Sequence, residues 1–168
     1  MLFRSSALRA CGLGADAVAR LAALTLESPQ GASHLAAHLR LSNSQADALG
    51  AAARRHPSYD PQTSEADARR WLYKQGRENF LRAAIVSWAS SAAATGDEAR
   101  KDRAFLAHRW TIPAMPVRGA DVLALGVGAG PEVGRVLAAF EEWWMSADFP
   151  SDAATHKRTL QALVADRY

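Results

Sequence analysis

Residues 117–145 read VRGADVLALGVGAGPEVGRVLAAFEEWWM, and this stretch decides the fold of the chain. Gly126, Gly128 and Gly130 stand at alternate positions, and Pro131 follows directly. Glycine accepts positive φ and proline suits the first position of a helix, so the pattern predicts a turn that ends at a helix N-terminus. The unpaired N–H groups and the positive dipole end of such a terminus favour an anion.

Two interpretations of this stretch compete. In the first, residues 122–125 form a β-strand, and the glycines form the nucleotide loop of a Rossmann-like or methyltransferase-like domain. In the second, residues 121–125 form a short helix, and the glycines close a helix–turn–helix hairpin. A methyltransferase loop has an acidic residue where Ala124 stands, and both nucleotide folds need further β-α units. Only 38 residues follow Gly130, and their pattern is helical. The hairpin is therefore favoured.

The rest of the chain also predicts helices, because no segment alternates polar and apolar residues over five positions. We expect an all-α, multi-helical bundle of roughly eight or nine helices. Besides the hairpin, helices are expected over residues 15–27, 32–39, 42–55, 64–76, 77–94, 97–110 and 152–166.

Several local signals set the expected helix ends. Ser42 with Gln45 has the spacing of a capping box, and Ser64 with Asp67 has a similar one. The segment 28–31, Ser-Pro-Gln-Gly, is expected to break the first helix from the second. Ser151 is the expected N-cap of the last helix.

The segment 112–116 holds two prolines and is expected to be extended. It divides the chain into a helical body, 1–111, and a C-terminal helical tail with the glycine hairpin, 112–168; the two regions can still pack as one unit. No run approaches the roughly 18 apolar residues of a membrane helix, and the single Cys11 excludes a disulfide framework. The expected location is the cytoplasm, without a membrane partner.

Arginine dominates the basic residues. The chain has 17 Arg and 3 Lys against 17 acidic residues, a net charge of +3. Arginine binds phosphate through two hydrogen bonds and stacks on bases, which suits nucleic acid, although a GC-rich coding sequence also enriches arginine. The basic residues gather on two predicted helices and are candidate phosphate contacts: Arg69, Arg70, Lys74 and Arg77 on one, and Arg100, Lys101, Arg103 and Arg109 on the other.

The glycine turn has a structural and a functional interpretation. Structurally, Gly126 ends one helix and Pro131 begins the next. Functionally, the N–H groups at Gly128 and Gly130 form a phosphate nest, assisted by Arg118 and Arg135. Glu132 counts against the phosphate, because its carboxylate already complements the helix dipole. No residue pattern indicates a catalytic or metal site: His34 and His38 have a zinc-protease spacing but lack the glutamate general base.

Two features of the helix after the turn are expected to serve packing. Gly134 is expected to let two helices approach closely, since glycine inside a helix is otherwise unfavourable. Trp143 and Trp144 are adjacent and point about 100° apart, so one can be buried while the other lies nearer the surface.

Residues 119–137, GADVLALGVGAGPEVGRVL, are followed by FEEWW and then by DFP. This order resembles the C-terminal part of bacterial tRNA nucleotidyltransferases, the CCA-adding enzymes of the class II poly(A) polymerase family. The family form is similar to G-x-D-L-x-x-L-G-x-x-x-G-P-x-x-G-x-x-L. The segment LRLSN at 39–43 also resembles the start of the helical body in that family.

The resemblance implies a non-catalytic C-terminal region of such a protein. The parent would add CMP and AMP to RNA 3′ ends, using CTP, ATP and Mg²⁺ bound by a head domain that this chain lacks, so no cofactor is expected here. The implied partners are tRNA or another structured RNA, held through its backbone, and the protein's own N-terminal catalytic domain. The alternative is a helical protein-interaction or dimerisation module whose basic faces are incidental.

Overall fold

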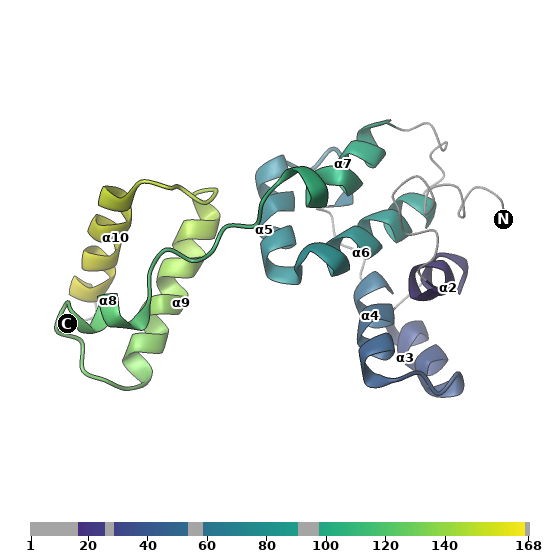
Figure 1. Ribbon diagram of the computed structural model, residues 1–168, viewed down its shortest axis with the longest axis horizontal. Coiled ribbons are helices and arrows are strands. Elements are labelled where there is room, and N and C mark those ends of the chain that lie inside the picture. The colour runs from purple at the N-terminus through teal and green to yellow at the C-terminus, as the bar shows by residue number, and fades with distance from the viewer. Residues whose placement is uncertain (1–16, 26–28, 54–58, 91–97, 167–168) are drawn as a thin grey trace. The chain divides into compact units, whose positions relative to one another are not determined.

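The computed structural model describes residues 17–25, 29–53, 59–90 and 98–166, and over these residues every regular element is a helix (Figure 1). The predicted all-α class is confirmed. The chain divides into two compact units, Met1–Ile112 and Pro113–Tyr168, here called the N-terminal unit and the C-terminal unit. None of the described helices is long and apolar enough to cross a membrane.

The N-terminal unit is built around one central helix, α6 (Arg77–Ser90), which packs against four other helices. A buried side chain contacts neighbours on several sides. Because α6 has helices around it, many of its side chains are buried. The described helices of this unit are α2 (Ala17–Thr25), α3 (Pro29–His38), α4 (Asn43–Ala53), α5 (Glu65–Gln75), α6 (Arg77–Ser90) and α7 (Glu98–Arg109).

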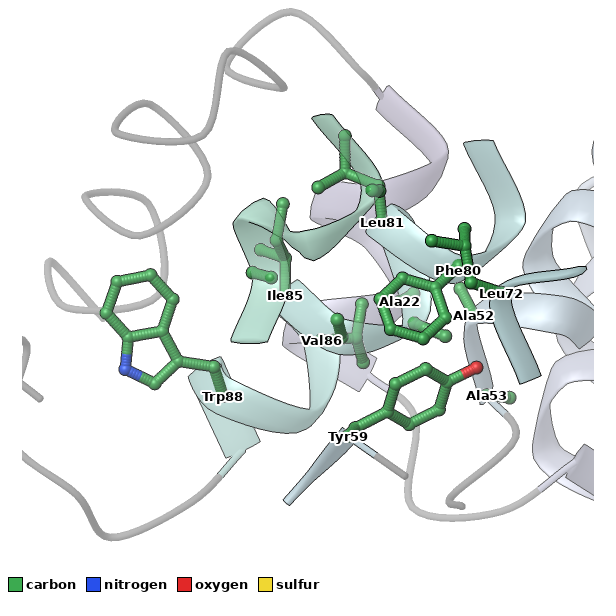
Figure 2. Close-up of a cluster of buried hydrophobic side chains, with 14 of the residues drawn as sticks. Ala22, Ala52, Ala53, Tyr59, Leu72, Phe80, Leu81, Ile85, Val86 and Trp88 are labelled. Atoms are coloured by element: carbon green, nitrogen blue, oxygen red, sulfur yellow. The ribbon is translucent and has the colours of Figure 1, made fainter. Parts of the chain in front are cut away.

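The core of the N-terminal unit combines a few large side chains with many alanines. Phe80, Leu72 and Ile85 are fully buried, and the alanines let the helices around them approach closely. Figure 2 shows the ring of Tyr59 beside that of Phe80, with 5.3 Å between the ring centroids. Trp71 Nε1 donates a hydrogen bond to the Tyr59 hydroxyl at 2.7 Å, which satisfies the polar end of a buried ring.

Two expected helix starts have the expected capping bonds. The Ser42 N–H donates to Gln45 Oε1 at 3.0 Å, and the Gln45 N–H donates to Ser42 Oγ at 3.3 Å. At α5, the Asp67 N–H donates to Ser64 Oγ at 3.1 Å. Each cap supplies an acceptor for an N–H group that has no partner inside its helix.

Two expected boundaries were wrong. The helix α3 begins at Pro29 and includes residues that were expected to form a break, because proline is well suited to a first helical turn. The cap of the last helix is Asp152 and not Ser151: the Thr155 N–H donates to Asp152 Oδ2 at 2.7 Å. Hydrogen bonds from Thr155 lower the pKa of Asp152, so the carboxylate stays ionised as a cap. The helix boundaries expected near residues 94–97 lie outside the described residues.

The C-terminal unit has three described helices, and the longest is the shared partner of the other two. This longest helix is α9 (Pro131–Ser146). Val136, Phe140 and Trp144 lie on one side of it and are buried, while Trp143 is partly exposed, as expected for adjacent tryptophans. The strand interpretation of residues 122–125 is wrong, because a short helix ends there. The helices are α8 (Gly119–Leu123), α9 (Pro131–Ser146) and α10 (Ala153–Ala165).

The connection from α9 to α10 is fixed by side chains on both helices. Trp144 Nε1 donates to the Pro150 carbonyl oxygen at 2.9 Å, and His156 Nε2 lies 2.7 Å from the same oxygen. Asp148 and Phe149 both adopt left-handed backbone conformations, with φ near 60°. The Phe149 ring packs edge-on against Trp144, with centroids 5.0 Å apart, and this packing offsets the unfavourable backbone.

Candidate functional site

The glycine turn joins α8 to α9 through two conformations that other residues rarely adopt. Gly126 has φ 90° and Gly130 has φ 154°, whereas Gly128 does not adopt positive φ. All three glycines are exposed, and the buried side chain of Val127 anchors the turn between them. The backbone therefore requires glycine at Gly126 and Gly130, and the Gly126 N–H donates within the turn to the Leu123 carbonyl oxygen at 3.0 Å.

The two arginines that were expected to assist the turn differ in their surroundings. Arg135 Nη1 pairs with Glu132 Oε2 at 2.7 Å, on the surface of α9. The Arg118 side chain is exposed and makes no ion pair within the described part of the chain, while its backbone N–H donates to Asp121 Oδ2 at 2.7 Å. Arg118 precedes α8, whereas the glycine turn follows this helix, so the arginine and the turn stand at opposite ends of α8 along the chain.

Gly134 does not have the expected packing role. It is exposed, and a Cβ atom built there would meet no atom within 4 Å. The expectation of close helix packing is therefore wrong: the packed face of α9 is formed by Val136, Phe140 and Trp144, and Gly134 lies on the open face.

Alanine substitutions at Gly130, in the turn, and at Gly134, inside α9, are predicted to change the free energy of unfolding in opposite directions. Gly134→Ala should raise the free energy of unfolding by about 0.5–1 kcal/mol, because alanine restricts the unfolded chain and fits the open face. Gly130→Ala should lower it by about 1–3 kcal/mol, because φ 154° is strained for any residue with a Cβ. Urea unfolding followed by circular dichroism measures both, and a loss of stability in Gly134→Ala would contradict the open-face assignment.

The basic residues of α5 are largely engaged with acidic neighbours. Arg69 Nη1 lies 2.8 Å from Glu65 Oε1, and Arg70 Nη2 lies 2.6 Å from Asp67 Oδ1. Lys74 also has an interaction partner. Arg77, at the start of α6, is exposed and makes no ion pair within the described residues, so it is the most available cation of this predicted cluster.

The second basic cluster, on α7, serves the fold. Arg103 is 8% exposed, and its guanidinium donates to the carbonyl oxygens of Thr63 at 2.5 Å and Ser64 at 3.3 Å. Burial lowers the pKa of Arg103, and the carbonyl oxygens accept hydrogen bonds from the buried guanidinium. Its assignment as a phosphate contact is wrong, because its donors face the loop before α5. Arg100 pairs with Asp60 at 3.3 Å, and Lys101 pairs with Glu98 at 3.1 Å.

Charge is unequally divided between the units. The N-terminal unit has 15 basic and 10 acidic residues, a formal charge of +5. The C-terminal unit has 5 basic and 7 acidic residues, a formal charge of −2. The net positive charge of the chain therefore belongs to the N-terminal unit, whereas the glycine turn belongs to the net acidic unit.

Each unit also holds a cavity that sequence patterns did not predict. In the C-terminal unit, a mostly apolar pocket of about 350 Å³ lies between α8 and α10, with Lys157 and His156 among its lining residues. In the N-terminal unit, a more polar groove of about 600 Å³ is bounded by α3, α4 and the α5–α6 junction. The residues that line each cavity are far apart in sequence, so no local motif marks them.

Within the described residues, no three His, Cys, Asp or Glu side chains lie close enough to hold a metal ion. His34 and His38 are both exposed on α3. No family model matches the chain, and no curated protein or solved structure is significantly similar to it. The functional argument therefore rests on the residue pattern and on the geometry of the described residues.

Proposed function

We propose that this chain is the non-catalytic, tRNA-binding C-terminal region of a protein related to tRNA nucleotidyltransferases and poly(A) polymerases. In this proposal, a separate catalytic domain adds CMP or AMP to the RNA 3′ end. The helices described here hold the RNA through its phosphate backbone, so they need cations and N–H donors but no catalytic residues.

The observation that carries the proposal is the agreement between the family-like pattern and the backbone of the hairpin. In that pattern, glycines stand at Gly126 and Gly130, where the turn adopts φ values of 90° and 154°. The acidic position is Asp121, which accepts a hydrogen bond from the Arg118 N–H and caps α8. Three pattern positions thus have physical roles in one helix–turn–helix hairpin, which supports the family relation better than residue identity alone.

The residues after α9 add a second point of agreement. The pattern DFP occupies residues 148–150, where Asp148 and Phe149 adopt left-handed conformations and the Pro150 carbonyl accepts from Trp144. Of the two adjacent tryptophans, Trp144 fixes the connection between α9 and α10, and Trp143 lies nearer the surface. The pattern therefore encodes the whole three-helix tail rather than the turn alone.

Arg77 and Arg118 are the phosphate contacts that we favour among the predicted candidates. Both side chains are exposed, and neither forms an ion pair within the described residues. Arg69, Arg70 and Arg135 have carboxylate partners at 2.6–2.8 Å, and a phosphate would have to displace these partners. A free guanidinium gains more from a phosphate than one that must first leave a carboxylate.

A double substitution tests this assignment. In Arg77→Ala/Arg118→Ala, the slope of the logarithm of the tRNA association constant against the logarithm of salt concentration should become shallower by about two, one for each lost phosphate contact. Filter binding or fluorescence anisotropy measures the slope, and Arg135→Ala serves as the matched control because Arg135 is already paired. An unchanged slope in the double variant would reject these two residues as phosphate contacts.

The alternative, a protein-interaction or dimerisation module, is favoured by one set of observations. The C-terminal unit is net acidic, holds the apolar pocket of about 350 Å³, and exposes Leu123, whose exposed fraction is 45%. This function predicts concentration-dependent self-association in analytical ultracentrifugation, weakened by Leu123→Asp, with no salt-dependent binding of tRNA. A monomer at all concentrations would count against the dimerisation form of this alternative.

A further inference from the structure

The groove of the N-terminal unit is lined by small residues and by several polar side chains. Its apolar lining comes largely from alanines of α3 and α4 and from Gly50, none of which fills the space above it. Its polar lining includes Arg40, Asp47, Gln75 and Asn79. A volume of about 600 Å³ lies within the range of small-molecule binding sites.

Arg40 stands where glycine would be the more favourable residue. It follows the C-terminus of α3 with φ 52°, and the Leu41 N–H donates to the Ala36 carbonyl at 3.0 Å, which closes the helix end. Glycine is the usual residue at such a position because it has no Cβ to clash with the backbone. Arg40 therefore lines the groove at a position whose backbone conformation is unfavourable for any residue with a Cβ.

Three polar side chains of the groove, those of Arg40, Asp47 and Gln75, make no polar contact within the described residues. Neither Arg40 nor Asp47 forms an ion pair, and the Gln75 side-chain amide has no hydrogen-bond partner, within the described residues. Asn79 donates through Nδ2 to the Gln75 carbonyl at 3.3 Å, which orients its side chain and leaves Oδ1 as an acceptor. One cation, one carboxylate and two amides thus line a single groove with hydrogen-bonding capacity to spare.

These groups match the parts of a nucleotide. A guanidinium binds phosphate through two parallel hydrogen bonds, and side-chain amides of Gln and Asn pair with the edges of bases. A carboxylate can accept from ribose hydroxyls, as acidic residues do in dinucleotide sites. The alanine and glycine surface leaves room for a planar ring to lie against it.

We propose that the groove between α3, α4 and the α5–α6 junction binds a nucleotide, with Arg40 on the phosphate and Gln75 and Asn79 at the base edge. The nucleotide is either free or part of a single-stranded segment of RNA. Only the RNA segment rests on the RNA-binding function proposed above. All lining residues of the site belong to the N-terminal unit.

The test titrates the full chain with each of the four nucleoside 5′-monophosphates and, separately, with a short single-stranded oligoribonucleotide, followed by NMR chemical shifts. Shifts should be largest for amides lining the groove. Arg40→Gly should weaken binding by about tenfold or more, because a charge-assisted hydrogen bond is lost, while the urea midpoint of unfolding rises. Arg40→Lys should restore part of the affinity, since it keeps the charge.

A pair of substitutions at Gly50 tests the groove without touching the cation. A Cβ at Gly50 meets no atom within 4 Å, so Gly50→Ala should fold and bind as the parent does. Gly50→Leu should place a larger side chain in the groove and abolish binding, with the helical circular dichroism signal unchanged. Equal binding in Gly50→Ala and Gly50→Leu would overturn the site.

The remaining outcomes separate the sources and the two proposals. Binding of monophosphates assigns a free nucleotide, and binding of the oligoribonucleotide alone assigns an RNA segment; both support the site if Arg40→Gly weakens them. Inorganic phosphate that binds as well as the monophosphates, or no binding of either probe, overturns the inference. If the Arg40→Gly and Gly50→Leu variants still bind tRNA in a salt-dependent way, the proposed RNA-binding function stands, but the groove is not the site where the RNA binds.

Discussion

Arg103→Met is expected to lower the free energy of unfolding of the N-terminal unit by about 2–4 kcal/mol. The guanidinium, 8% exposed, donates to the carbonyl oxygens of Pro61 at 3.4 Å, Thr63 at 2.5 Å and Ser64 at 3.3 Å. Methionine fills similar space but donates no hydrogen bond, so the loop before α5 loses its attachment to α7. Urea unfolding followed by far-ultraviolet circular dichroism gives the change in stability.

Arg109→Met is the matched control for this prediction, because it makes the same substitution on the same helix at an exposed position. Arg109 pairs with Asp102 and, at 2.7 Å, with Glu65. Ion pairs at the surface contribute at most about 1 kcal/mol, so a small effect is expected. Equal losses in Arg103→Met and Arg109→Met would show that burial and the carbonyl contacts do not decide the role of Arg103.

Phe140→Ala is expected to unfold the C-terminal unit. Phe140 is fully buried on α9, and its ring centroid lies 5.3 Å from that of Trp143 and 5.9 Å from that of His156. Removing a buried phenylalanine costs about 3–5 kcal/mol, which is comparable to the whole stability that a domain of under about 70 residues usually has. The unit spans residues 113–168, so little stability should remain.

The measurement for Phe140→Ala is limited proteolysis with mass spectrometry. Cleavage should move into residues 119–165, while the peptides of α5 and α6 stay protected. Leu123→Ala is the control in the same unit: Leu123 is 45% exposed, so its substitution should change stability by no more than about 0.5 kcal/mol. Unchanged protection of α9 and α10 in Phe140→Ala would contradict the assignment of Phe140 to the core.

The sequence predicted the helical class and most helix starts because those features depend on neighbouring residues. The caps at Ser42 and Ser64 bond to residues three positions later, and Gly126 and Gly130 are needed for their own φ angles. These signals can therefore be recognised from a few consecutive residues. Where two capping residues were adjacent, at Ser151 and Asp152, the choice depended on the path of the chain entering α10, which local sequence does not determine.

The roles of the basic residues depended on distant parts of the chain and were harder to predict. Arg69 and Arg70 have acidic partners four and three residues away, so their pairing follows from helical spacing. Arg103 instead contacts a loop some 40 residues earlier in the chain, and no local pattern distinguishes it from a solvated arginine. The groove around Arg40 likewise joins α3, α4 and the α5–α6 junction, and it exists only after these helices have packed.

The proposed RNA-binding function has one direct test: the dissociation constant of the full chain for tRNA, measured over a series of salt concentrations. If the chain binds the RNA backbone, the logarithm of the association constant should fall linearly with the logarithm of the salt concentration. The slope should correspond to two or more phosphate contacts, and the affinity should be highest at the lowest salt concentration, about 50 mM. Tryptophan fluorescence at each salt concentration verifies that the chain stays folded. An affinity that does not change with salt, or no detectable binding at about 50 mM, would contradict the proposed function.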